Sequence, residues 1–358
     1  MHEEETSHLG DGGDSSMWAK STVRMVALPV LLVCIFCGVP VNAAQTEIAN
    51  DYVAIRFPDG LDVPREVQEL LLKRITESIC YLEGFLEYTF PRQIQYEFVE
   101  STLLSIGTFG LPNIVRDSLP VPMNIEDPSF HKPFNPHEII HLVNHDVWQD
   151  CVIDSLDEGF AWLVSYLYLE FPLHYEASCL LALGELPPLE SLLIDHYQGS
   201  RYKYRVSARG SLSFLGFLHE KFGHQVIILL HKGLAEIYSE GRVRENVISL
   251  IEECTSTSLA ELEREWHGVL HATEVHPRYL TALLLHKEYD KADLLTLLHL
   301  SQYYNVEIDD PMFIAEVQSL ESDMQNFVKD ESLNEDELRE RIEKVVKWAK
   351  EIRQRLFR

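Results

Sequence analysis

The sequence has little positive charge for its length. Its 358 residues include 30 Lys and Arg against 57 Asp and Glu, which gives a formal net charge of −27. Because nucleic-acid phosphates and anionic lipid surfaces repel such a chain, neither is expected as a partner. Internal repeats and low-complexity linkers are also missing. A hydrophobic content of 46% is enough to build a substantial core, so a folded protein with a solvated acidic surface is expected.

A hydrophobic run long enough to span a membrane is lacking near the N-terminus. The apolar run 26–41 is shorter than the roughly 20 residues of a membrane helix. It follows Lys20 and Arg24 and ends in small residues around Ala43. This order of positive charge, apolar core and small residues is typical of a secretory signal. Residues 1–44 are therefore expected to direct secretion or another extracytoplasmic location with cleavage near Ala43, or, if uncleaved, to anchor the chain in a membrane.

Cysteine is scarce, and outside the apolar run 26–41 no Cys-x-x-Cys spacing occurs among the six cysteines of the sequence. A zinc cluster built from cysteines is therefore not expected. Cys34 and Cys37 would leave with a cleaved signal. One or two disulfides are possible in an oxidising compartment among those that remain. These are Cys80, Cys151, Cys179 and Cys254.

The spacing of apolar residues predicts an α+β fold that changes character near residue 135. Residues 51–57 alternate as in a strand, 64–88 have helical spacing, and 93–99 are typical of a second strand. Gly and Pro interrupt 107–125, which indicates irregular strands or an edge hairpin. From Asn135 onward almost every segment has helical period. We therefore expect a small N-terminal mixed α/β lobe with a strand edge, followed by a helical lobe and a helical C-terminal extension.

The expected boundaries divide the chain into residues 1–44, a domain over 45–272 and an extension over 273–358. In the extension, residues 334–358 place apolar side chains on one stripe among many charges, which predicts an amphipathic helix. Such a helix either packs against the rest of the protein or binds a partner, for example in a coiled coil. The sequence allows both.

The stretch Asn-Pro-His-Glu-Ile-Ile-His, which begins at Asn135, has the residue types of a metal site. Asn135 suits a helix N-cap, and Pro136 suits the first helical position, where no amide donor is required. His137 and His141 are four residues apart, so they lie on one face of that helix and can ligate one zinc ion. Glu138 is placed to take a proton from a water on the metal.

A zinc site needs a third protein ligand, and the sequence offers two candidates. His145 lies one turn beyond the second histidine, but three ligands from one straight helix rarely enclose a tetrahedral ion. Glu158 lies on a second predicted helix that can pack against the first. Ser155 and Glu158 also match a capping box, in which the carboxylate would bond back to the Ser155 amide. We prefer Glu158 as the ligand because the histidine pair lies just upstream.

These residues resemble the motif of the gluzincins, the thermolysin-like and peptidase-MA-like zinc metallopeptidases. That motif is His-Glu-x-x-His followed by Glu on the next helix, often within Glu-Gly-x-Ala. His137, Glu138, His141 and Glu158 match it position by position, although the 16-residue gap before Glu158 is slightly short. The resemblance implies a thermolysin-like zinc lobe, a bound Zn²⁺, and hydrolysis of peptide or protein substrates.

A second block, 210–223 with 259–266, is similar to the helical lobe of small peptidase-MA-like domains. The family places a Tyr or His near this block to stabilise the oxyanion. The aligned position is close to Arg209, and the nearest tyrosines are Tyr202 and Tyr204. Tyr204 is the preferred candidate, although it can equally be a rim or core tyrosine. The Gly-x-Met-Glu-Asn signature of aminopeptidases is missing, which favours endopeptidase action.

Two further interpretations concern neighbouring residues and the class of protein. Asp154 and Asp157 are candidates either to orient a ligand histidine or to cap a helix. The alternative to an enzyme is a non-catalytic zinc-binding module, a pseudo-peptidase that acts in partner recognition. An open coordination position favours the enzyme, whereas a fourth protein ligand favours the module.

Overall fold

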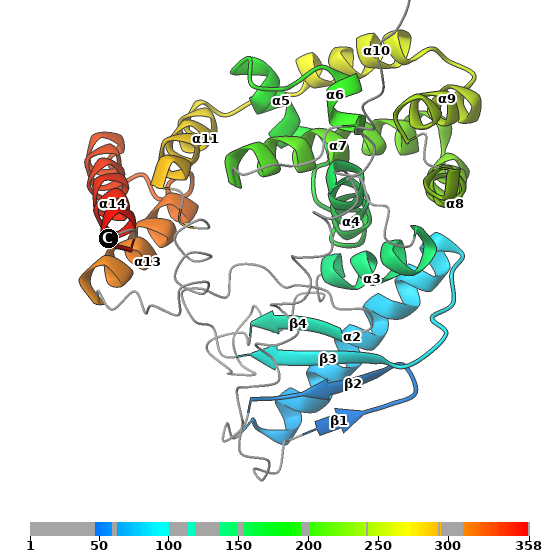
Figure 1. The fold of residues 1–358 in the computed structure, drawn as a ribbon, viewed down its shortest axis with the longest axis horizontal. Helices are drawn as coiled ribbons and strands as arrows, with labels where there is room; N and C mark the ends of the chain where they lie inside the picture. The colour runs from blue at the N-terminus through cyan, green and yellow to red at the C-terminus, as the bar shows by residue number, and fades with distance from the viewer. Residues whose placement is uncertain are drawn as a thin grey trace, which may run out of the picture. The chain divides into compact units, whose positions relative to one another are not determined.

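The protein is described by a computed structural model at residues 47–58, 63–99, 114–118, 136–148, 154–194, 201–240, 243–292, 294 and 311–356. Residues 45–358 form one compact unit. The predicted α+β class is confirmed, because a small sheet is accompanied by a majority of helices (Figure 1). The predicted export segment 1–44, Asn135 and Cys151 lie outside the described residues. Within the described ranges, no helix is long and apolar enough to cross a membrane.

The sheet has four strands in the order β1-β2-β3-β4. The first pair is antiparallel, and the two following pairs are parallel. A parallel pair needs a crossover connection, and the helix α2 supplies it between β2 and β3. The predicted strands near 51–57 and 93–99 and the predicted helix over 64–88 are confirmed. The elements are β1 (Glu47–Ala49), β2 (Val53–Arg56), α2 (Arg65–Leu86), β3 (Ile94–Val99) and β4 (Ile114–Ser118).

The strand β4 is the described part of the segment 107–125, for which irregular strands or an edge hairpin were expected. It pairs with β3 in parallel register and lies at the edge of the sheet. The rest of 107–125, where a hairpin partner would lie, is outside the described residues. The expectation of an edge strand is met at 114–118.

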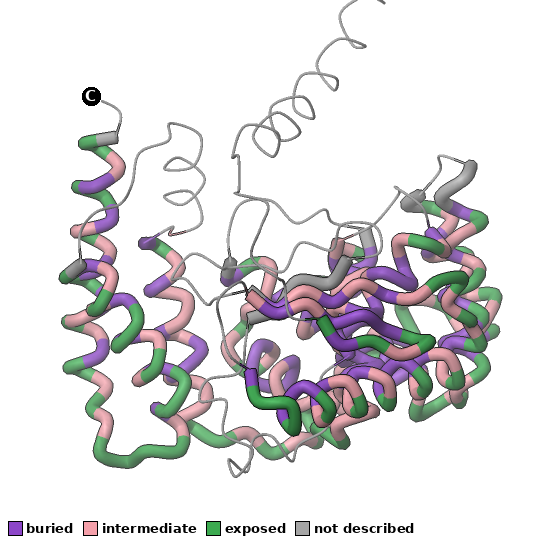
Figure 2. Tube along the Cα trace, turned by 90° about the horizontal axis from the view of Figure 1, so that it is seen from below, coloured by how far each residue is buried: buried purple, intermediate pink, exposed green. Residues whose placement is uncertain are grey.

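The helices α3 (His137–Trp148) and α4 (Asp154–Tyr168) lie between two hydrophobic cores. One core joins the sheet and α2 to Ile139 and Ile140 of α3 and to Val164 of α4. The other buries Leu156 and Phe160 of α4 among the later helices. Figure 2 shows the buried positions along the strands and on one side of many helices. Both helices are thus held on two sides, which fixes the side chains that they carry.

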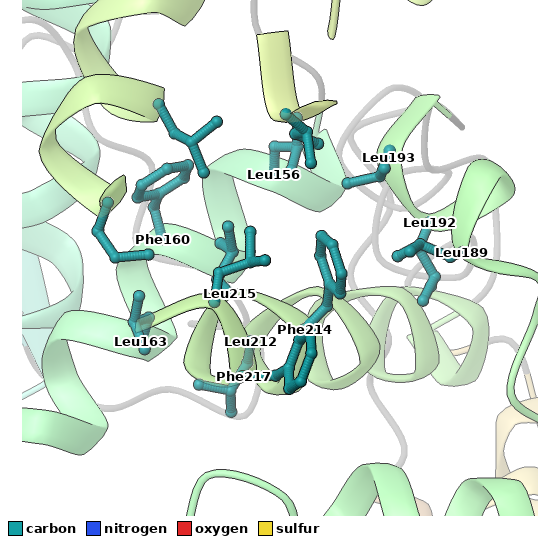
Figure 3. Packing of buried hydrophobic residues seen from close by; sticks show 14 of the residues in the cluster. Leu156, Phe160, Leu163, Leu189, Leu192, Leu193, Leu212, Phe214, Leu215 and Phe217 are labelled. Carbon is teal, nitrogen blue, oxygen red and sulfur yellow. The ribbon is translucent and has the colours of Figure 1, made fainter. Parts of the chain in front are cut away.

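The helix α7 packs closely on α4. A Cβ atom added at Gly159 would lie 2.6 Å from the Cβ of Ser211, so only glycine permits this approach. Figure 3 shows side chains of both helices in one cluster, among them Leu163 of α4 and Leu215 of α7. The close approach brings the N-terminal half of α7 towards Glu158. The helices of this region are α5 (Tyr175–Ala182), α6 (Leu189–Ile194), α7 (Arg201–Phe222), α8 (His224–Glu240), α9 (Val243–Thr255) and α10 (Leu259–Ala272).

The last helices, α11 (Pro277–Tyr289), α13 (Pro311–Asn326) and α14 (Glu335–Leu356), share a hydrophobic cluster of their own. The amphipathic helix predicted at 334–358 is α14. Asn334 caps it, since its side-chain oxygen accepts from the amides of the first turn. The apolar stripe is buried within the protein, as the packing alternative predicts. It consists of Leu338, Ile342, Val345, Ala349 and Ile352.

The described cysteines carry free thiols. Cys80 is exposed, Cys254 is partly buried and Cys179 is buried. No disulfide therefore joins any two of these three residues.

Candidate metal centre

His137 and His141 of α3 face Glu158 of α4, and together they form the ligand triad. The Nε2 atoms of the two histidines are 3.2 Å apart. The carboxylate of Glu158 places Oε2 3.4 Å from Nε2 of His137 and Oε1 3.5 Å from Nε2 of His141. Across the described part of the chain, this is the group whose atoms lie close enough together to hold a metal ion, and His145 is not part of it.

The spacing of the ligand atoms suits a tetrahedral metal ion. Ligands about 2.1 Å from an ion at tetrahedral angles lie about 3.4 Å from one another. The nitrogens are 3.2 Å apart, and each lies 3.4 or 3.5 Å from one of the two oxygens of Glu158, which is close to that edge length. Two imidazole nitrogens and one carboxylate are also donors that transition-metal ions accept. The residues present therefore fit a divalent metal ion that they would hold at three of its four tetrahedral positions.

The helix that carries the histidines begins one residue later than predicted. The carbonyl of Pro136 accepts hydrogen bonds from the amides of Ile139 and Ile140, so Pro136 stands just before the helix. Ile139 and Ile140 are fully buried in the core beneath the sheet. Their burial fixes the rotation of α3 and thereby the direction of its histidines.

Glu158 does not serve as the partner in a capping box. The helix α4 begins at Asp154, so Ser155 already lies inside its first turn. The Ser155 hydroxyl instead donates to the carbonyl of Leu192 at 2.5 Å. The Glu158 carboxylate is left to face the two histidines, which is the arrangement preferred from the sequence.

A buried hydrogen-bond chain extends from His141 away from the ligand triad. Nδ1 of His141 lies 2.7 Å from Oδ2 of Asp157, whose Oδ1 accepts from the Asn144 amide at 2.6 Å. The oxygen of Asn144 then accepts from Nε2 of His231 at 2.8 Å. Asp157 was a candidate to orient a histidine, and it contacts one. Asn144 could have been suspected from its place three residues after His141, but nothing in the sequence points to His231 on α8.

The charged groups around the ligand triad raise the pKa of His141 and lower the pKa of Glu158. Burial would lower the pKa of His141, but Asp157, Glu158 and Glu138 raise it to about 9. Burial would raise the pKa of Glu158, yet His137 and His141 lower it overall. The centre is thus an anionic, partly buried pocket that attracts positive charge.

Burial lowers the pKa of His231 to about 4, so this imidazole is neutral near pH 7. Because the Asn144 oxygen needs a donor, the single proton of the neutral ring lies on Nε2. The hydrogen-bond chain from His141 therefore ends at a histidine of fixed tautomer. Each donor and acceptor along it has a single role.

The tyrosine chosen from the sequence lies at the centre. The Tyr204 side chain on α7 is hydrogen-bonded to Glu158, and burial together with that carboxylate raises its pKa. The hydroxyl therefore remains protonated near pH 7. The charge of Glu138, which is half-buried on α3, also raises the pKa values of Tyr204 and His141. The structure brings all five predicted site residues into one region.

A stack of rings extends from the other histidine. The ring of His137 lies 4.2 Å from that of Trp162, and the guanidinium of Arg209 lies 3.8 Å over the same indole. Nε of Arg209 pairs with Oε2 of Glu176 at 3.1 Å. The sequence singled out Arg209 only as an aligned position. Its position over Trp162 is a tertiary contact that no local sequence pattern predicts.

Comparison with protein-family models and with curated proteins found no match. The geometry described above is therefore the ground on which a function can be proposed. Its central part is the ligand triad, with the carboxylate of Glu138 and the protonated phenol of Tyr204 beside it.

Proposed function

We propose that the protein is a zinc-dependent metallopeptidase of the gluzincin type, in which the ligand triad holds Zn²⁺. The observation that carries the proposal is the close grouping of two imidazole nitrogens, 3.2 Å apart, with the two oxygens of Glu158, which lie 3.4 and 3.5 Å from them. Catalytic zinc sites use three protein ligands of this kind and keep the fourth position for water or substrate. A bound Zn²⁺ supplies a water of lowered pKa and polarises the carbonyl of the scissile bond.

The residues around the triad have separate tasks in this proposal. Glu138 is the general base, which takes the proton of the attacking water and delivers it to the leaving amine. Tyr204, which stays a neutral phenol, donates a hydrogen bond to the oxyanion of the tetrahedral intermediate. Asp157 keeps the proton of His141 on Nδ1, so that the lone pair of Nε2 is directed at the metal.

The proposal extends to the organisation and location of the chain. We assign residues 45–272 to the peptidase domain, with the thermolysin-like zinc lobe formed by the helices from α3 to α10, and residues 273–358 to the extension. The segment 1–44 is proposed to direct secretion. Mass determination of the mature N-terminus tests this, because cleavage near Ala43 predicts a start at residue 44 or 45. A chain that keeps this segment and sediments with membranes would instead be anchored.

The decisive experiment combines metal analysis with cleavage of a broad peptide library. The purified protein is expected to contain one zinc ion per chain and to cleave peptides. Glu138→Gln preserves size but removes the base, so zinc should remain while hydrolysis falls by about 100-fold to 10,000-fold. His137→Ala should lose the metal itself. Glu77→Gln, the same change on the exposed side of α2, should leave both zinc content and cleavage unaltered.

The outcomes separate catalysis from metal binding. If Glu138→Gln cleaves peptides as well as the parent, the proposed mechanism is wrong. If the parent binds zinc but cleaves nothing in the library, the chain is the non-catalytic zinc-binding module instead. If the parent binds no zinc, both proposals fail.

A further inference from the structure

A cavity of about 470 Å³ lies beside the ligand triad. Trp162 and Tyr204 line it. Trp162 stacks on His137, and Tyr204 is hydrogen-bonded to Glu158, so two walls of the cavity touch metal ligands. Its volume lies within the range of pockets that bind small ligands or side chains. A group that enters the cavity is thus adjacent to a peptide bond held at the metal.

Two arginines of α7 share one partly buried carboxylate at this cavity. Arg205 and Arg209 are one helical turn apart and both line the space. Glu176 of α5 lies 3.1 Å from Nε of Arg209 and 3.5 Å from Nε of Arg205. Burial would raise the pKa of Glu176, but the two guanidinium groups lower it, so the carboxylate is ionised. At this carboxylate, one negative charge faces two positive charges.

The second nitrogen edge of Arg209 is available for a ligand. Glu176 engages its Nε, whereas Nη1 is buried without a hydrogen-bond partner among the described residues. An arginine donor left buried and unbonded is unfavourable unless a ligand completes it. The guanidinium plane is held over Trp162 at 3.8 Å and over Tyr166 at 5.2 Å. A planar cation that is fixed in this way offers the paired donors that a carboxylate accepts.

Acidic residues also line the cavity, but each is already engaged elsewhere. Oδ1 of Asp290 accepts from the backbone amide of Tyr202 at 2.9 Å. Oε1 of Glu321 accepts from the hydroxyl of Tyr289 at 3.1 Å. Neither of these bonds involves the two arginines. The unbonded donor Nη1 belongs to the cationic Arg209, which favours an anionic ligand group.

We propose that this cavity binds a carboxylate of the peptide substrate through Arg209, with Arg205 adding positive charge. The carboxylate is either the C-terminus of the peptide or the side chain of an Asp or Glu near the scissile bond. This inference rests on the proposed function, because a peptide held at the metal is what presents its neighbouring group to the cavity. The chain would then prefer acidic peptides although its own surface is acidic.

Binding can be measured apart from hydrolysis on the zinc-loaded Glu138→Gln protein by isothermal titration calorimetry. The probes are synthetic heptapeptides of one sequence in four forms, with a central Glu or Gln and with a free or amidated C-terminus. At least one carboxylate should strengthen binding by about 10-fold to 100-fold over the peptide that lacks both, as expected for a charge-assisted bond. If the tighter binding depends on the central Glu, the carboxylate that the cavity binds is a side chain. If it depends on the free terminus, that carboxylate is the C-terminus.

The variant that tests the residue is Arg209→Lys. It keeps the charge and the pairing with Glu176 but lacks the planar pair of donors, so most of the preference should vanish. Arg264→Lys, the same change at an exposed pair on α10, should leave the preference intact. Zinc content and the melting temperature of Arg209→Lys are measured alongside to show that the variant is folded. If the zinc content or the melting temperature of Arg209→Lys falls, the proposal is judged from the acid preference of the parent protein.

Failure of this inference and failure of the proposed function look different. Equal binding of all four peptides, no binding of any, or a folded Arg209→Lys protein with an undiminished preference would overturn the carboxylate site. Any of these results is compatible with hydrolysis by the parent. An acid preference in a protein that cleaves nothing would instead support the site and remove only the proposed catalysis.

Discussion

Asp157 hydrogen-bonds Nδ1 of His141 at 2.7 Å and accepts from Asn144 through its other oxygen at 2.6 Å. Both carboxylate oxygens are thereby used, and the ring of His141 is held by an element other than its own helix. When a metal is bound, a ligand histidine oriented in this way keeps its remaining proton on Nδ1, so that Nε2 can face the metal. The arrangement joins α3 to α4 at the point where the ligand triad is formed.

Asp157→Asn should weaken zinc binding by about 10-fold to 100-fold, the usual cost of losing such a partner. An asparagine replaces one of the two accepting oxygens by an NH₂ donor, so the bond to either His141 or Asn144 is lost. Competition with a chromophoric chelator measures the affinity. Asp154→Asn removes the same charge from the same helix and should change the affinity little. Equal losses in the two variants would show that only the general negative charge of α4 matters.

Glu158→Ala should remove most of the zinc affinity, because two ligands from one helix leave half of a tetrahedral site without protein atoms. Ser155→Ala is the matched test of helix capping. It should leave zinc affinity unaltered and cost about 1 kcal/mol through the lost bond to Leu192. Metal content after dialysis and urea unfolding give the two readouts. Normal zinc content in Glu158→Ala would exclude this residue as a ligand.

Gly159→Ala should destabilise the protein by about 1–3 kcal/mol, since the new methyl group overpacks the contact between α4 and α7. The added Cβ would lie 2.6 Å from the Cβ of Ser211. Ser211→Gly removes that atom and should recover part of the loss in the double variant. Chemical unfolding of the four proteins gives the coupling free energy.

Gly268 on α10 is the control for this cycle, because no atom lies within 4 Å of a Cβ added there. Gly268→Ala should stabilise the protein, as expected for alanine within an exposed helix. Additive effects of Gly159→Ala and Ser211→Gly would mean that the two positions do not meet.

The sequence was sufficient where structure is encoded locally. Three local patterns each predicted one element, and the structure has that element at each place. They are the alternation at 51–57, the helical spacing at 64–88 and the histidine pair four residues apart. Proline at position 136 marked the start of α3 to within one residue. The choice of Glu158 combined the upstream histidine pair with the assumption that consecutive amphipathic helices pack together, as α3 and α4 do.

The parts that escaped prediction depend on contacts between distant segments. Asn144 and His231 are 87 residues apart and become partners only because α8 packs on α3. The position of Arg209 over Trp162 likewise requires α7 to approach α4 at Gly159. The capping-box alternative for Glu158 failed for the same kind of reason, because Leu192 of α6 offered Ser155 a tertiary acceptor.

His231 should make the protein lose stability as pH falls below neutrality. The pKa of this histidine is lowered from 6.5 to about 4 in the folded protein, chiefly by burial. Between these two values the unfolded chain binds a proton that the folded protein does not, so acid favours unfolding. The stability is therefore complete above pH 6.5 and declines towards pH 4. The total loss from this group is on the order of 3 kcal/mol.

His231→Gln isolates this effect because its amide can donate to Asn144 as Nε2 does, but it does not titrate. Urea unfolding at several pH values from 7 to 4.5 should show the parent losing about 2 kcal/mol more than the variant over that range. The other titrating groups, His141 included, are present in both proteins and cancel in the difference. Parallel curves would mean that His231 is already protonated in the folded state, and the hydrogen-bond chain to Asp157 would then need a different assignment of its protons.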